Sequence, residues 1–347
     1  MRFYTHRHKY YCGIDLHASY MYVCIMDRDG DILLHKNLKT RPELFLAAVA
    51  PYKEDLVVGS ECVFLWYWLA DLCEDHGITF KLGHALYMKA IHGGKAKNDR
   101  IDSRKIAALL AGGNFPLAYT YPRGMRSTRD LLRRRNYLVR HRAELDVHAQ
   151  NTATQYNLPP FGKRIDRKTN REGFAERFPD HAIRKNVELD MTLMDHFDQV
   201  INSIENEILR TVRRQHQETV SILKSVPGIG KILSLVILFE IHDISRFPTV
   251  QQFASYARLV KCQHRSAGKL RGTGGAKIGN AHLKWALSEA AALFLRGNQK
   301  AQKLKARLER KHGEGKSMSI ITHKLGRAIY YMLKRKTVFQ PERFYSC

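Results

Sequence analysis

The sequence has few cysteines, no long apolar run and little acidic charge, and each shortage excludes a class of protein. Six cysteines are spread over 347 residues without a Cys-X-X-Cys pair, which excludes a zinc ribbon and a disulfide framework. No stretch approaches about 18 uncharged apolar residues, so we expect no membrane partner, and the first residues lack the apolar segment of a signal peptide. A content of 44% hydrophobic and 10% aromatic residues excludes a disordered chain. We therefore expect a folded, cytoplasmic protein of two or three domains.

Acidic residues are outnumbered, because 33 Asp and Glu stand against 58 Lys and Arg and leave a net charge of +25. The surplus is concentrated in three segments. Residues 123–142 hold eight Arg and one Asp, residues 255–285 hold seven basic residues and no acid, and residues 296–343 hold fourteen basic residues and three Glu. A surface kept basic for solubility usually mixes both signs, whereas blocks of one sign are typical of proteins that track phosphates. The charge distribution therefore predicts a nucleic-acid partner.

The first 122 residues have the pattern of a mixed α/β domain. Short apolar runs bounded by turn residues predict strands, and apolar residues at helical spacing predict the helices between them. The expected strands are 10–15, 20–26, 32–34, 55–61 and 78–82, and the expected helices begin at Pro42, Trp66 and Asp102. This β-β-β-α-β-α-β order followed by a helix favours a mixed sheet with helices on its faces.

The remaining residues are predicted to be mostly helical. A basic helical stretch over 123–155 leads into an irregular connector at 158–181 and then into a helical stretch over 183–223. Apolar residues of the last stretch alternate spacings of three and four, the pattern of a coiled-coil seam. This seam either packs on the 123–155 helix of the same chain or joins two subunits. The expected domains are 1–122, a helical region 123–222, and a mostly helical domain 223–347.

Four carboxylates are placed where a metal-dependent phosphoryl-transfer site needs them. Asp15 follows the first strand, Glu61 ends the fourth, and Asp99 and Asp102 lie three residues apart at the start of a helix. Mg²⁺ binds through a few carboxylates, water and substrate phosphate, so this set is chemically sufficient. Each acid also has a purely structural interpretation, since Asp102 could cap its helix and Asp15 could begin a turn. The basic neighbours that suit a phosphate beside such metals are Lys97, Arg100 and Arg104.

These residues carry a resemblance to a known family. Gly13-Ile14-Asp15, Glu61 and the segment 97–102 resemble the N-terminal RuvC-like domain, of ribonuclease H fold, in the Piv-type insertion-sequence transposases. These Asp-Glu-Asp-Asp enzymes are also called bridge recombinases. Three segments of the second half, 226–230, 243–247 and 266–283, are similar in that order to the C-terminal transposase domain of the family. The resemblance implies that the four acids hold Mg²⁺ or Mn²⁺.

The resemblance further implies that a serine of the C-terminal domain is a nucleophile, and the matching position is Ser266. The segment around it has no acid, so a phosphodiester would be drawn in and the charge growing on phosphorus would be balanced. Without the family resemblance, a serine in a basic glycine-rich loop is more typical of a phosphate contact than of a nucleophile. Ser255 and Tyr256 are the nearest alternative nucleophiles. The basic residues expected to contact nucleic acid are Arg265, Lys269, Arg271 and Lys277 near the serine, and Arg133, Arg134 and Arg135 in the Arg-rich helix.

The segment that contains Gly228, Gly230 and Lys231 interrupts two predicted helices. It resembles the hairpin of helix-hairpin-helix modules, in which glycine exposes backbone N–H groups to a nucleic-acid phosphate. The alternative is a plain turn between two core helices. The sequence does not decide between them.

The family resemblance implies a transposase that cuts and rejoins donor and target DNA through a covalent phosphoserine. It also implies a structured noncoding bridge RNA that pairs with both DNAs, a dimeric or tetrameric assembly, and a place in the bacterial cytosol and nucleoid. Two alternatives remain open from the residues alone. One is a metal-only RuvC-like junction endonuclease without a serine nucleophile, and the other is an RNA-binding protein without catalytic activity.

Overall fold

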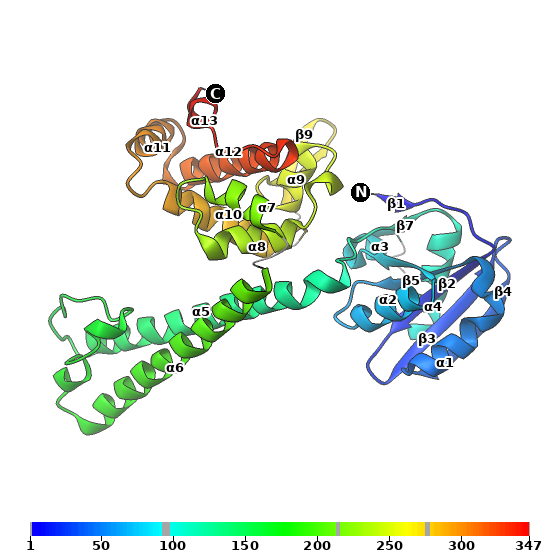
Figure 1. Ribbon diagram of the computed structural model, residues 1–347, viewed down its shortest axis with the longest axis horizontal. Helices are drawn as coiled ribbons and strands as arrows, with labels where there is room; N and C mark the ends of the chain where they lie inside the picture. The colour runs from blue at the N-terminus through cyan, green and yellow to red at the C-terminus, as the bar shows by residue number, and fades with distance from the viewer. Residues whose placement is uncertain (1, 92–97, 213–215, 275–277, 347) are drawn as a thin grey trace. The chain divides into compact units, whose positions relative to one another are not determined.

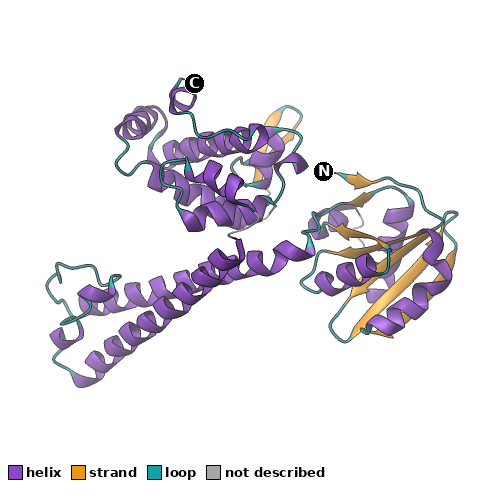
Figure 2. Ribbon diagram, in the orientation of Figure 1, coloured by secondary structure: helices purple, strands orange, loops and turns teal. Residues whose placement is uncertain are grey.

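The computed structural model describes residues 2–91, 98–212, 216–274 and 278–346 (Figure 1). The chain forms two compact units, Met1–Gly124 and Met125–Cys347. The first unit contains the large sheet, and the second is mostly helical (Figure 2). The predicted fold class, a mixed α/β sheet followed by a mostly helical remainder, is confirmed.

The first unit is built on a five-stranded mixed sheet in the order β4-β3-β2-β5-β6. Strand β2 is central because it pairs antiparallel with β3 on one side and parallel with β5 on the other. All five predicted strands are present in this sheet. Their bounds are β2 Tyr10–Leu16, β3 Tyr20–Asp27, β4 Ile32–Lys39, β5 Leu56–Glu61 and β6 Thr79–Gly83.

Helices cover both faces of this sheet. Alternate residues of β2 point to opposite faces, so Cys12 and Ile14 pack with Phe45 and Leu69 on one face, while Tyr11 packs with the residues of α4 on the other. Helices α1 and α2 therefore cover the first face and α4 the second. The bounds of the helices are α1 Pro42–Val49, α2 Trp66–Asp75, α3 Ala85–Ile91 and α4 Asp99–Ala111. The short 3₁₀ helix Ala50–Asp55 and a small pair of strands, β1 Phe3–Tyr4 and β7 Phe115–Pro116, complete the unit.

Two long helices run side by side in opposite directions at the start of the second unit (Figure 1). Helix α5 spans Arg123–Gln155, and α6 spans His181–Val212. The predicted seam residues Met194, Ile201 and Ile208 are buried. The seam therefore packs within one chain, which was one of the two expected arrangements. Ion pairs between the helices join Arg135 to Glu205 and Arg142 to Asp198, and a hydrogen bond of 2.6 Å joins His148 Nδ1 to Asp190 Oδ2.

The predicted connector between these helices is irregular apart from two 3₁₀ turns, Lys168–Asn170 and Ala175–Arg177. It has its own small core, in which Phe174 and Phe178 pack against α5 and α6 residues. Arg171 is buried and pairs with Asp195 and Asp198 of α6. The connector is thus fixed to the helical pair.

The C-terminal helices enclose α8, whose residues from Leu233 to Ile241 are all buried. The helical stretch expected over 183–223 is divided, because α6 ends at Val212 and α7 begins at Gln217. The expected glycine-rich loop contains a two-stranded β-hairpin instead. The elements are α7 Gln217–Lys224, α8 Lys231–Ile241, a 3₁₀ turn Ile244–Arg246, α9 Val250–Tyr256, β8 Cys262–Ser266, β9 Lys269–Gly274, α10 Ala281–Phe294, α11 Gln299–His312, α12 Glu314–Arg335 and α13 Pro341–Tyr345.

Candidate active site

Two of the predicted acids lie at the carboxyl edge of the sheet. Strands β2 and β5 are parallel, and their pairing register runs through Ile14 and Ser60. Asp15 and Glu61 are each one residue further along. Because the carboxyl ends of neighbouring parallel strands meet at one edge of a sheet, the register brings Asp15 and Glu61 to the same edge.

Helix α4 brings the other two acids to the central strand. A Cβ atom at Gly13 would lie 2.2 Å from the carbonyl oxygen of Ser103 and 2.3 Å from the nitrogen of Ala107. Only glycine therefore lets the backbone of α4 approach β2 so closely. Asp99 and Asp102 occupy the first turn of this helix, beyond the contact and toward the end of β2.

The start of α4 is capped by Asn98, whose side-chain Oδ1 accepts a hydrogen bond of 2.8 Å from the backbone N–H of Ile101. The helix begins at Asp99, three residues earlier than predicted. Asp102 is therefore not the cap of this helix. Its carboxylate instead lies 3.5 Å from the Nζ of Lys105.

His17 completes a cluster that the sequence did not predict. Its Nε2 lies 3.3 Å from Oδ2 of Asp15 and 3.7 Å from Oδ1 of Asp99. One ligand atom from each of these three residues lies within 4.8 Å of the other two, and among the described residues this is the group that could hold a metal ion. Side chains two apart on an extended strand point the same way. His17 follows directly after the last residue of β2, Leu16, so its position two residues after Asp15 was a signal for this contact.

The pKa of Asp15 is raised, and the largest cause is the partial burial of its carboxyl group. Burial raises the pKa of Asp15, the His17 imidazole lowers it, and the charges of Asp99 and Asp102 raise it further, so that its pKa lies above the usual range. A divalent cation would relieve this repulsion, and carboxylate oxygens are the ligands that Mg²⁺ and Mn²⁺ prefer. The residues present therefore fit a divalent metal through their carboxylates, with His17 hydrogen-bonded to Asp15.

The surroundings of the cluster are open and partly basic. Arg100 and Arg104 are exposed on α4, whereas Lys97 lies outside the described residues. Phe64, three residues after Glu61, is 85% exposed. Sequence analysis missed this residue, because an aromatic side chain just before a helix is usually part of the core. Exposed aromatic rings are the groups on which nucleic-acid bases stack.

The predicted nucleophile lies at the end of the β-hairpin. Ser266 is the last residue of β8 and pairs with Lys269 across a two-residue turn, Ala267-Gly268. Both turn residues have positive φ, 50° for Ala267 and 75° for Gly268, as a type I′ hairpin turn requires. Ser266 and the two basic residues Lys269 and Arg271 are exposed. The Arg265 side chain and Lys277 lie outside the described part of the chain.

The base of the hairpin is anchored by Asn280 on its C-terminal side. Its backbone N–H donates to the carbonyl of Tyr256 at 2.6 Å, and its Nδ2 donates to the Tyr256 hydroxyl at 3.1 Å. The Oδ1 of Asn280 also caps α10 by accepting from the N–H of Leu283. Arg258 donates to the carbonyl of Gly279 at 3.0 Å. The two ends of the segment that carries Ser266 are thus held together.

Glu240 connects this anchor to the long helix α5. Its side chain is 3% exposed, and its carboxylate accepts from Arg129 at 3.1 Å, Arg133 at 2.7 Å and Asn280 at 2.7 Å. Burial alone would raise the pKa of Glu240, but the hydrogen bonds and charges of Arg133 and Arg129, together with Asn280, hold it below its ordinary value. The carboxylate is therefore charged, and it neutralises part of the Arg-rich helix.

The other predicted nucleic-acid contacts divide into internal and exposed residues. Arg133 and Arg135 pair with Glu240 and Glu205, whereas Arg134 is exposed and lies over the ring of Tyr137. Arg134 therefore remains the candidate for phosphate binding in this helix.

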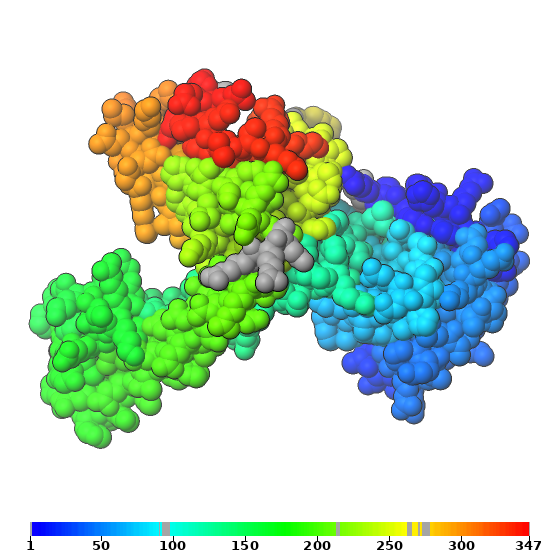
Figure 3. All heavy atoms as spheres, viewed as in Figure 1, coloured from blue at the N-terminus to red at the C-terminus, as the bar shows by residue number. Residues whose placement is uncertain are grey.

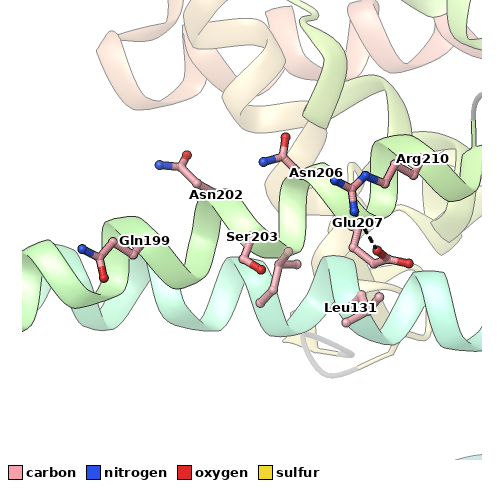
Figure 4. A pocket seen from close by; sticks show the side chains of 8 residues that line it. Leu131, Gln199, Asn202, Ser203, Asn206, Glu207 and Arg210 are labelled. Carbon is pink, nitrogen blue, oxygen red and sulfur yellow. Dashed lines mark ion pairs between the residues drawn. The ribbon is translucent and has the colours of Figure 1, made fainter.

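A polar groove along α6 (Figure 4) is lined by none of the residues predicted to contact nucleic acid. Among its lining residues are Gln199, Asn202, Ser203 and Asn206, with an ion pair between Glu207 and Arg210.

The predicted helix-hairpin-helix glycines have different surroundings. Gly228 has φ of 89°, and a Cβ atom there would lie 2.6 Å from the backbone carbon of Leu293. Gly228 thus serves the packing against α10. Gly230, by contrast, has open space around it and precedes α8, and Lys231 beside it is exposed. Gly230 and Lys231 therefore stay available for the predicted phosphate contact.

Comparisons with known proteins match two separate segments of the chain. Residues 12–158 match a family model described as a transposase, of the DEDD type found in IS110. Residues 220–306 match the Transposase IS116/IS110/IS902 family. The acidic cluster lies within the first match, and the serine hairpin lies within the second.

Three curated relatives span nearly the whole chain. The transposase for insertion sequence element IS1111A of Coxiella burnetii is 23% identical, covering 94% of this chain and 90% of the relative. The transposase for element IS1328 of Yersinia enterocolitica is 23% identical, covering 94% of this chain and 97% of the relative. A probable family 20 transposase of Pseudomonas aeruginosa is 24% identical, covering 95% of this chain and 98% of the relative.

The RuvC-like sheet with its acidic edge and the matched helical domain define an insertion-sequence transposase. The chain belongs to the IS110-type family of these enzymes, and it carries both of the family's domains. Membership implies a DNA substrate and the use of divalent metal. Across the residues that the structure describes, every helix is too short or too polar to cross a lipid bilayer.

Proposed function

We propose that this transposase cuts and rejoins DNA through two groups, a carboxylate metal site and a serine nucleophile, under the guidance of an RNA. The observation that carries the proposal is the cluster of Asp15, Asp99 and His17 at the edge of a RuvC-like sheet. The exposed Ser266 on a basic hairpin supports the second group. The two groups belong to different compact units of the chain.

Asp15, Glu61, Asp99 and Asp102 would hold one or two Mg²⁺ or Mn²⁺ ions. A bound divalent cation would supply charge stabilisation at the scissile phosphate. His17 fixes the orientation of Asp15 by its hydrogen bond. Arg100 and Arg104 would hold the flanking backbone phosphates, since both are exposed on the helix that carries two of the acids.

Ser266 would perform the covalent step. Its Oγ attacks the phosphorus of the scissile bond, a P–O bond to one side of the DNA strand breaks, and the departing strand leaves as a hydroxyl after it gains the proton lost from the serine. The product is a phosphoserine diester, so the bond energy is kept for rejoining without ATP. Lys269, paired with Ser266 across the hairpin, would balance the charge that grows on phosphorus.

The proposed partners follow from the family and the charge. Donor and target DNA are held by backbone contacts, while a structured noncoding bridge RNA selects sequence by base pairing. The net charge of +25 supports two polyanions bound together. A dimer or tetramer in which one subunit's serine works with another subunit's acids is the assembly we propose.

The test is a DNA cleavage assay with Mg²⁺ and the cognate RNA, in which protein–DNA adducts are trapped by denaturation. Asp15→Asn should abolish cleavage, and Ser266→Ala should abolish both the adduct and the joined product. Ser255→Ala tests the nearest alternative serine, which is also exposed in the same domain, and it should leave both the adduct and the joined product unchanged.

Two results would replace the proposal by its alternatives. Full cleavage by Ser266→Ala without any adduct would establish the metal-only junction endonuclease. If the original protein binds RNA but cuts no DNA, and Asp15→Asn binds RNA equally well, the carboxylates are incidental, as in an RNA-binding protein without catalysis.

A further inference from the structure

A hollow of about 480 Å³ lies in the C-terminal unit between α12, the segment that follows it, and α13. This volume is in the range of sites that bind small ligands or single groups of larger ones, about 300 to 1,000 Å³. The carboxyl-terminal residues that form one of its walls, red in Figure 3, lie at the surface. None of the residues in the hollow belongs to the two groups described above.

The wall formed by α12 carries a basic stripe. His323, Arg327, Tyr331 and Arg335 follow one another at intervals of four residues, so they share one face of the helix. Burial and the charge of Arg327 lower the pKa of His323, so the positive charge at neutral pH comes from the arginines and lysine.

Two further cations complete the rim, Lys324 of α12 and Arg343 of α13. Among the described residues that line the hollow, none is acidic. Within the described part of the chain, no carboxylate forms an ion pair with Arg327, Arg335 or Arg343. The hollow therefore concentrates the positive charge of these three arginines.

The floor of the hollow is apolar and aromatic. Met332, Phe339 and Phe344 are buried beneath it. Tyr331 remains 37% exposed even though Arg335 lies over its ring at 5.1 Å, and Val338 of the opposite wall is 58% exposed. A flat apolar group can therefore enter beside Tyr331 while an anionic group stays at the basic rim.

We propose that this hollow binds an unpaired nucleotide of a single-stranded nucleic acid. The base would stack at Tyr331, and the adjoining phosphates would be held by Arg327, Arg335 and Arg343. A nucleotide combines a flat aromatic group with an anion at short distance, which is the combination that the floor and rim accommodate. In a duplex the bases are stacked on one another and cannot enter.

This proposal rests on the nucleic-acid partner of the proposed function, but on neither of its catalytic groups. Binding can therefore be measured with EDTA present, where Asp15 and Ser266 have no part. Fluorescence anisotropy of the full chain would use three probes: a short labelled single-stranded RNA, the single-stranded DNA of the same sequence, and the corresponding DNA duplex.

The variants separate stacking from charge. Tyr331→Ala removes the ring without a change of charge, and Tyr331→Phe restores it. Arg327→Ala removes one charge inside the hollow, while Lys316→Ala removes one from an exposed position of α12 outside it. Thermal melting of each variant confirms that it is folded.

We expect Tyr331→Ala to weaken single-strand binding by about 5-fold or more, as the loss of one stacked base does, and Tyr331→Phe to bind like the original protein. Duplex binding should change much less. Arg327→Ala should weaken single-strand binding more than Lys316→Ala.

A loss of affinity confined to the RNA probe assigns the site to an RNA strand, and a loss confined to the single-stranded DNA probe assigns it to an unpaired DNA strand. Both results support the proposal. Equal losses on duplex and single strand, or a folded Tyr331→Ala that binds as before, would overturn it while leaving the cleavage results of the proposed function unaffected.

Discussion

The buried carboxylate of Glu240 should be essential for the stability of the second unit. Glu240→Gln keeps the shape of the side chain but removes the charge that faces Arg129 and Arg133. The Arg129 side chain is 10% exposed and that of Arg133 is 32% exposed, so both guanidinium groups would lose the negative charge of Glu240 at a place where water replaces it poorly. Removal of one member of such a buried ion pair costs about 3 to 5 kcal/mol. The free energy of unfolding should fall by that amount.

The stability that Glu240 contributes should also depend on pH, and it should decrease in acid. The folded pKa of Glu240 lies below its ordinary value of 4.5. The carboxylate therefore contributes its full stabilisation at pH values above about 4.5, and the contribution is lost as the pH falls through the folded pKa. The difference in stability between the original protein and Glu240→Gln should be largest at neutral pH and should shrink in acid.

Hydrogen exchange measured by mass spectrometry over a urea series is the appropriate assay, because peptides of α8 report the second unit separately from the first. Glu218→Gln is the matched control, since Glu218 is exposed and its nearest cation, Lys336, is 3.8 Å away. It should change stability by less than about 0.5 kcal/mol. If α8 of Glu240→Gln became exchangeable at the same urea concentration as in the original protein, the assigned role of the ion pair would be refuted.

Three further predictions concern the acidic cluster. Gly13→Ala should lower the melting temperature and abolish cleavage, because the new Cβ would lie 2.2 Å from the Ser103 carbonyl oxygen. Gly124→Ala is the control, since Gly124 has open space around it and its substitution should not lower the melting temperature. Equal melting temperatures of the two variants would contradict the packing argument. His17→Ala should weaken Mn²⁺ binding in calorimetry by about 10- to 100-fold, as loss of a group that orients a ligand does, and unchanged affinity would exclude that role. Phe64→Ala should leave thermal stability unaltered but slow DNA cleavage, and an unchanged rate would show that the exposed ring has no part in the reaction.

Much of the first unit could be predicted because its signals are local. The buried strands are short, continuous apolar runs, and such runs remain visible in sequence whatever they pair with. The start of α4 was placed at Asp102 because an acid before an apolar stretch is a common cap. The actual cap, Asn98, lies four residues earlier. Helix ends are set by such small differences between neighbouring polar side chains.

The features that were missed depend on contacts between distant residues. The Arg-rich helix was interpreted as a uniform phosphate-binding face, yet Arg133 pairs with Glu240, 107 residues away, and Arg135 pairs with Glu205, 70 residues away. The hairpin of Ser266 was interpreted as a loop, since an alanine at positive φ is not a turn signal. The spacing of apolar residues predicted the packing seam of α6, but it did not identify α5 of the same chain as the helix that packs against it. The roles of Ser266 and of the four acids remain predictions.

Mass spectrometry of the trapped protein–DNA adduct tests the central proposal most directly. After nuclease and trypsin digestion, the proposal predicts a nucleotide attached to the fragment Ser266–Lys269, which trypsin releases by cleavage after Arg265 and Lys269. A nucleotide attached to the fragment that contains Ser255 and Tyr256 would assign the nucleophile elsewhere. DNA cleavage with no modified fragment would contradict covalent catalysis by any residue of the chain.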